Sequence, residues 1–162
     1  MKVLHLAFCV IYLTSSRGEL ATCQKQDDVK SLIKDLKSNN PKTRASAAED
    51  LGHRGAVRAA EVKEAIPSIV EVLKKDRDAN VRKAAATALG QVDPDPSTAV
   101  PALTAALRDK APSVRIAAAG SLGMLGGEAK DAVPALQEAQ KDKDRAVSRA
   151  ASMALRTIRK KN

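Results

Sequence analysis

Side chains that could support catalysis are few and scattered in this sequence. Beyond the apolar N-terminal run, the chain has a single histidine, His53, and a single cysteine, Cys23. It contains no Ser-His-Asp set, no Cys–His pair and no glycine-rich phosphate loop next to a strand. One histidine cannot build a site of paired histidine ligands, and His53 is interpreted as a solvated loop residue. We therefore expect no enzyme activity, no cofactor and no metal.

The composition indicates a core built from small and aliphatic side chains. The only aromatic residues are Phe8 and Tyr12, and tryptophan is absent. Alanine dominates from Ala45 onward, together with Leu and Val. A compact globular core usually relies on a few large rings, whereas small side chains suit helices that approach one another closely.

A segment that recurs every 33 residues organises the rest of the chain. Three copies start at Val81, Val114 and Val147 and read VRKAAATALG, VRIAAAGSLG and VSRAASMALR. An earlier copy, TRASAAEDLG, starts at Thr43, which is 38 residues before the next copy. A second motif, Ala-[Ile/Val]-Pro-x-[Leu/Ile], keeps the same period. Self-similarity at this period predicts a stack of helical repeats, and places four inserted residues in the loop after Gly52.

Each repeat is predicted to be a hairpin of a first helix, helix A, and a second helix, helix B. Helix A carries the proline, which is tolerated in a first turn or at a kink. Helix B carries one apolar stripe, and Gly90 and Gly123 are expected to end it in a left-handed cap. One hairpin cannot bury its stripe alone, so neighbours must stack. The expected repeats span about 27–56, 57–93, 97–126 and 129–160 within a domain of residues 27–162.

Both ends of the array turn polar where inner repeats are apolar. At the C-terminus, the positions of Gly90 and Gly123 become Arg156, and Ser148, Ser152, Arg156 and Arg159 form one polar stripe. At the N-terminus, Asp35 stands where inner repeats have Val or Ala. Solvent-facing capping repeats require such residues, so we expect a whole four-repeat array.

The pattern D-x(4,5)-VR-x-AA-x-x-ALG with A-[IV]-P-x-L resembles the HEAT-like repeat first associated with phycobilisome lyases. The resemblance covers nearly all of the chain after residue 26. It implies an all-α fold, a right-handed α-solenoid of about four HEAT-like hairpins (an alpha–alpha superhelix). The family includes lyases, a metal hydroxylase, DNA-repair enzymes and plain scaffolds, so the resemblance specifies the fold more closely than the function.

In such repeats, the Asp of the turn and the Arg of helix B resemble a ladder that runs along the stack. Asp76 with Arg82 and Asp109 with Arg115 match that pattern, whereas Ser38 and Ser148 leave it incomplete at the two ends. We interpret the ladder as structural. Its expected members are Arg44, Asp76, Arg82, Asp109, Arg115 and Asp142.

The first 22 residues are expected to be a secretory signal peptide. Lys2 supplies a positive start, and the apolar run from Val3 to Leu13 is too short to span a bilayer. Thr22-Cys23 resembles a bacterial lipobox, in which lipidation of Cys23 would anchor the protein to a membrane. The chain is therefore expected to be exported, periplasmic or secreted.

The remaining candidate is a surface. The formal net charge is +9, and 26 basic and 18 acidic residues remain, a net +8, without the first 22 residues. In HEAT-like stacks the B helices usually line the concave face. The positions that helix B turns away from the core include Ala45, Gly120 and the residues expected to contact a partner: Glu49, Lys83, Thr87, Gln91, Ile116, Met124, Arg149 and Met153.

Three functions remain open. The first is an exported, monomeric scaffold that binds a protein of unknown identity on this face. The second is an enzyme or accessory subunit related to bilin lyases, which would require an intracellular protein. The third is a binder of polyanions or anionic lipid, which would lose its ligand steeply with salt. Binding of nucleic acid is not expected, because the chain has no aromatic residue for base stacking after the leader.

Overall fold

The computed structural model describes residues 28–92 and 96–160. The expected signal peptide (residues 1–22) and Cys23 lie outside these residues. Within the described residues all regular structure is helical, and the helices form an all-α solenoid of the armadillo/HEAT type.

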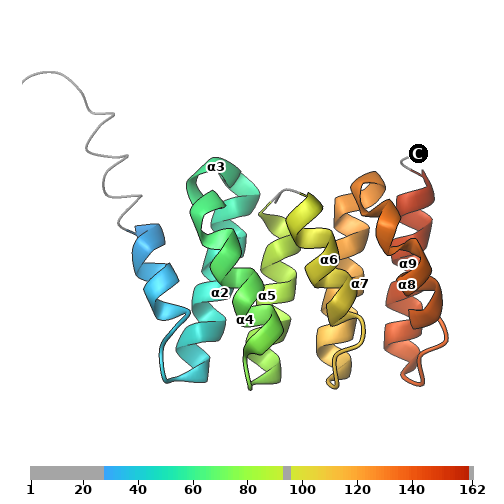
Figure 1. Ribbon diagram of the computed structural model, residues 1–162, viewed down its shortest axis with the longest axis horizontal. Helices are drawn as coiled ribbons and strands as arrows, with labels where there is room; N and C mark the ends of the chain where they lie inside the picture. The colour runs from blue at the N-terminus through green and yellow to red at the C-terminus, as the bar shows by residue number, and fades with distance from the viewer. Residues whose placement is uncertain (1–27, 93–95, 161–162) are drawn as a thin grey trace, which may run out of the picture.

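Four helical hairpins stand side by side in chain order, as the colours from blue to red show in Figure 1. Each hairpin has an A side and a B helix, and the A helices α4 and α6 lie in front of the B helices in this view. The first hairpin is residues 28–35 with α2 (Pro41–Val57). The second is α3 (Ala59–Val62), η1 (Lys63–Ala65) and α4 (Ile66–Lys75) with α5 (Ala79–Gln91). The third is α6 (Pro96–Ala106) with α7 (Pro112–Leu125), and the fourth is η2 (Gly126–Ala132) and α8 (Val133–Ala139) with α9 (Arg145–Lys160).

Local sequence signals fix where these helices begin. The Asp78 carboxylate accepts hydrogen bonds from the backbone N–H groups of Asn80 and Val81, and Asn40 caps α2 in the same way. Pro67 lies in the first turn of α4, where a missing N–H costs nothing. Pro101 lies inside α6. The prolines of α4 and α8 thus lie in the first turn, as expected, whereas that of α6 lies in the helix interior.

One continuous core runs through the whole stack. Each B helix contributes a leucine that is at most 3% exposed, and the opposing A helices contribute an isoleucine or leucine. The residues are Leu51, Leu89, Leu122 and Leu155 from the B helices, and Ile69, Leu103 and Leu136 from the A helices. Alanines fill the space between the B helices, which pack against one another far more closely than the A helices do.

Two expectations about the ends of the B helices are wrong. Gly90 and Gly123 do not cap their helices, because α5 continues to Gln91 and α7 to Leu125. The glycine with a positive φ, 60°, is Gly126. The insertion after Gly52 is not simply a loop either, because α2 continues to Val57. His53 therefore lies on α2 and is exposed there.

Candidate functional site

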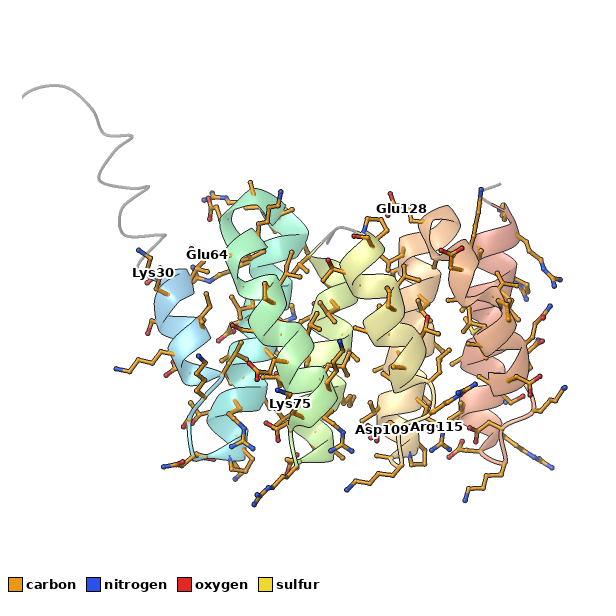
Figure 2. All side chains as sticks on the ribbon, in the orientation of Figure 1. Lys30, Glu64, Lys75, Asp109, Arg115 and Glu128 are labelled. Atoms are coloured by element: carbon orange, nitrogen blue, oxygen red, sulfur yellow. The ribbon has the colours of Figure 1, made fainter. Side chains whose placement is uncertain are left out.

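Three ion pairs connect successive hairpins at the edge where the A helices turn into the B helices. The guanidinium of Arg82 in α5 donates from Nε and Nη2 to the two carboxylate oxygens of Asp109, at 2.7 and 2.8 Å. Arg44 binds Asp76 in the same bidentate way, at 2.6 and 2.9 Å. Arg115 binds Asp142 at 2.8 and 2.9 Å. Figure 2 shows Asp109 and Arg115 at this edge.

Each guanidinium also holds the turn of its own hairpin. Nη1 of Arg82 donates to the carbonyl oxygens of Asp76 and Arg77, at 2.9 and 3.1 Å. Arg44 and Arg115 make the equivalent pairs of bonds to their own turns. The carboxylates have a second task too, because Asp109 accepts a hydrogen bond of 2.8 Å from the backbone N–H of Ala111. One arginine thus joins its own turn to the turn of the next hairpin.

The side chains of the ladder are largely buried, between 5% and 16% exposed. The side chains of Arg82 and Asp109 are 5% and 13% exposed. The hydrogen bond from Arg82 is the main cause that lowers the pKa of Asp109, and it outweighs the effect of burial. The hydrogen bonds from Arg44 and Arg115 likewise lower the pKa of Asp76 and of Asp142. Each guanidinium thus makes four hydrogen bonds within the fold, which supports a structural role for the ladder.

The partners in the ladder differ from those that the repeat pattern suggested. Asp76 pairs with Arg44 of the preceding hairpin, and only its backbone carbonyl contacts Arg82. Ser38 and Ser148 therefore break no pair between the described hairpins, because three rungs suffice to join four of them. At the ladder's start, the carbonyl of Ser38 accepts from Arg44, and at its end the Ser148 hydroxyl donates to the carbonyl of Gln140.

Close contacts between the B helices reveal how their outward faces align. In chain order, a Cβ atom added to each of three helical glycines would lie 2.9, 2.9 and 3.1 Å from a Cα atom of the next B helix. Only glycine allows this approach. The glycines and the residues they contact are Gly52 with Ala88, Gly90 with Ser121, and Gly123 with Ala154.

These contacts place the outward positions of the four B helices in three rows, which we call the helix-B face. The middle row lies three residues before each glycine and one residue before each contacted residue: Glu49, Thr87, Gly120 and Met153. The rows one helical turn to either side are Ala45, Lys83, Ile116 and Arg149, and His53, Gln91, Met124 and Thr157. All eight residues expected to contact a partner lie on this face.

The helix-B face changes character along the stack. Its α2 end carries the exposed Glu49 and His53, whereas the α9 end carries the exposed Arg149 and Met153. Met124 and Met153 are 55% and 60% exposed. His53 and Thr157 were not among the residues expected here. The helical spacing of four residues from Met153 indicates Thr157. The same spacing from Glu49 would have indicated His53 if α2 had been expected to continue past Gly52.

Comparison with known proteins gives the family. A model of HEAT repeats matches residues 29–111 and 66–156. The chain belongs to the HEAT-repeat family. Among curated proteins, no significant match was found.

The solved structures similar to this HEAT-repeat chain are also helical repeat proteins. An engineered protein matches with a TM-score of 0.67 and 25% identity over 81% of this chain, which spans 62% of that protein. A designed armadillo repeat protein in complex with the peptide (KR)4 has a TM-score of 0.66 and 18% identity, over 85% of this chain and 69% of its own. The complex of CpcE and CpcF of phycocyanin lyase from a Nostoc species has a TM-score of 0.55 and 23% identity, and the match covers 80% of this chain and 98% of that chain.

The A side of this HEAT stack presents shallow grooves between neighbouring A helices. One of them, about 680 Å³, lies between α6 and the η2–α8 segment, and is lined by Val100, Thr104, Arg108, Glu128 and Asp131 among others. These grooves follow from the wider spacing of the A helices.

Over residues 28–92 and 96–160, no group of His, Cys, Asp or Glu side chains is placed to hold a metal ion. No helix in the same residues is long and apolar enough to cross a membrane.

Proposed function

We propose that this chain is a non-catalytic scaffold that binds a protein partner on its helix-B face. One observation carries the proposal. The ladder, the leucine core and the glycine contacts together hold the stack, and the exposed side chains of Lys83, Arg149 and the two methionines of the helix-B face are not among them. Met124, Met153, Lys83 and Arg149 are nevertheless exposed there on adjacent helices. Contiguous apolar side chains edged by charge are typical of protein-binding surfaces.

The fold is suited to this task. A stack of HEAT or armadillo hairpins offers an extended face built from equivalent positions of successive helices. The designed armadillo repeat protein above was solved with a peptide bound, which is a precedent for the fold. The phycocyanin-lyase complex supports a second candidate, an accessory subunit of an enzyme, in which binding of a partner subunit would again be this chain's own contribution.

We further propose that the protein acts after export, on the strength of the apolar N-terminal run described above. Mass analysis of the N-terminus of the protein purified from its native cells tests this. Loss of the first twenty or so residues, or a lipid on Cys23, would agree with export. An intact N-terminus in the cytosol would contradict it and would favour the accessory-subunit candidate.

The binding face is tested by charge reversal on each side of the stack. Lys83→Glu with Arg149→Glu changes two exposed cations of the helix-B face, whereas the matched control Arg108→Glu with Lys110→Glu changes two exposed cations elsewhere. We expect cross-linking and pull-down from the native compartment to recover less partner with the first pair only. Equal recovery with both pairs would place the binding surface elsewhere.

A further inference from the structure

Gly120 is a glycine that the fold does not need. It lies in the interior of α7 and is exposed, and a Cβ atom added to it would meet nothing within 4 Å. The helical glycines Gly52, Gly55, Gly90 and Gly123 are different, because an added Cβ would come within 2.3 to 3.1 Å of a neighbouring helix. Glycine inside a helix is less stable than alanine, and at Gly120 no packing contact compensates for this.

The missing side chain leaves open space at this position of the helix-B face, which we call the Gly120 hollow. Along α7, Ile116 and Met124 stand one turn before and one turn after Gly120. In the same row, Thr87 and Met153 stand on the helices to either side, which pack against α7 through Gly90 and Gly123. Four side chains around an empty centre form the arrangement that receives a single knob from a facing helix or strand. Methionine suits such a rim, because its flexible chain adapts to the shape of the inserted group.

The charge around this hollow is positive. α9 carries Arg145, Arg149, Arg156, Arg159 and Lys160 and no acidic residue. Among the described residues, none of these cations forms an ion pair, and neither does Lys83. Arg159 and Lys160 complement the negative end of the helix dipole, but Arg145 and Arg149 lie in the first half of α9, where the dipole does not favour a cation. A shallow groove beside Met153 is lined by Arg156, Thr157 and Lys160.

Resting on the proposed function, we propose that the Gly120 hollow receives one apolar side chain of an acidic partner segment, whose carboxylates pair with Lys83 and Arg149. Both cations lie one helix across and one turn along from Gly120. With helix axes about 9 Å apart and a rise of about 6 Å over four residues, each lies about 11 Å from the hollow. In a helical partner that lies across the B helices, glutamates seven residues to either side of the inserted side chain are about 10 Å from it. Each then lies about 6 Å, one helical turn, from the backbone of one cation, a gap that the long side chains of Lys83 and Arg149 can span.

Substitutions at Gly120 separate binding from folding. Gly120→Ala should raise the thermal midpoint by about 2–4 °C, because it removes a helix-interior glycine without a clash. Gly120→Gln should keep the fold and fill the hollow. The matched control is Thr104→Gln, which places the same side chain on the A side of the stack.

The probes are three labelled synthetic helical peptides, and the assay is fluorescence anisotropy with the protein lacking its first 22 residues. The first peptide has a central leucine with glutamates seven residues to either side, the second has alanine for the leucine, and the third has lysines for the glutamates. We expect binding of the first peptide, and about tenfold weaker binding of the other two. Gly120→Gln and Arg149→Glu should each weaken the first peptide about tenfold, whereas Thr104→Gln should leave it unchanged.

Several outcomes would overturn the inference. These are no binding of the leucine–glutamate peptide up to about 1 mM, equal binding of the lysine peptide, or full binding by Gly120→Gln. Stronger binding to vesicles of anionic phospholipid than to the peptide, with no effect of Gly120→Gln, would assign the cations of α9 to a lipid surface. If the helix-B charge reversals abolish capture of the native partner but these peptides fail, only the inference is lost. If the charge reversals have no effect on capture, the proposed function fails with it.

Discussion

Replacing Arg82 by methionine tests whether the ladder stabilises the packing of neighbouring hairpins or contributes as little as an exposed ion pair. The substitution keeps an unbranched apolar chain of similar length in α5 and removes the guanidinium. Four hydrogen bonds are lost with it, two to the carboxylate of Asp109 and two to the carbonyl groups of Asp76 and Arg77. Asp109, 13% exposed, is left with the N–H of Ala111 as its remaining hydrogen-bond donor.

The expected cost follows from this burial. Removing one partner of a buried ion pair typically costs about 3–5 kcal/mol, because the other charge stays buried without compensation. The edge of the stack gives Asp109 some access to water, so we expect about 3 kcal/mol of destabilisation. The surface pair of Lys75 and Glu71, with side chains 75% and 58% exposed, provides the comparison. Lys75→Met should cost no more than about 0.5 kcal/mol.

Urea unfolding followed by circular dichroism measures both variants. The double variant Arg82→Met with Asp109→Asn should recover part of the loss, because asparagine can still accept from Ala111 and carries no charge to bury. A loss below about 1 kcal/mol for Arg82→Met would refute the reasoning, since the ladder would then behave like an exposed pair. Equal losses in the single and the double variant would show that the uncompensated carboxylate is not the cause.

Three further results are expected. The pKa of each ladder aspartate is lowered, so these groups stabilise the fold above the usual aspartate pKa of about 3.9, and this contribution is lost as pH falls through the lowered values. Urea midpoints should therefore be flat above about pH 5 and fall below about pH 4, less steeply in Arg82→Met. Gly90→Ala should lower the thermal midpoint, because its Cβ would lie 2.9 Å from the Cα of Ser121, and overpacking of this kind costs about 1–3 kcal/mol. Ser121→Ala should cost about 1–2 kcal/mol in urea unfolding, because it removes the buried bond of 2.8 Å to the carbonyl of Ala86.

The sequence was sufficient for the fold because equivalent positions recur in register. Three copies at a spacing of 33 define which residues of each helix face the core, and Leu89, Leu122 and Leu155 are all buried as that register requires. The positions of the helix-B face follow from the same spacing, since a helical residue four positions from an exposed one lies on the same side. The period thus carries the fold, the family and the placement of the face.

The period does not specify how one repeat contacts the next. As far as the sequence shows, Asp76 could pair with Arg82 of its own hairpin or with Arg44 of the preceding hairpin. The offset between neighbouring hairpins, which the period does not specify, places it beside Arg44. Gly90 and Gly123 resemble helix caps in the sequence because the period does not show that the next B helix lies against them. Their replacement by Arg156 in the last repeat was the available signal, because α9 has no further B helix to approach among the described residues.

Within one repeat protein, the copies show which positions the fold constrains. Where the fold needs one side chain, the copies agree: the core row is leucine in all four B helices, and the ladder position is arginine in α2, α5 and α7. The middle row of the helix-B face is instead Glu49, Thr87, Gly120 and Met153, four residues that differ in charge and volume. Since the stack tolerates each of them at the same place in the same helix, their order along the face is free to match a partner. A ligand that reads this face would therefore be asymmetric, with its apolar and acidic groups over α7 and α9 rather than spread evenly over the four repeats.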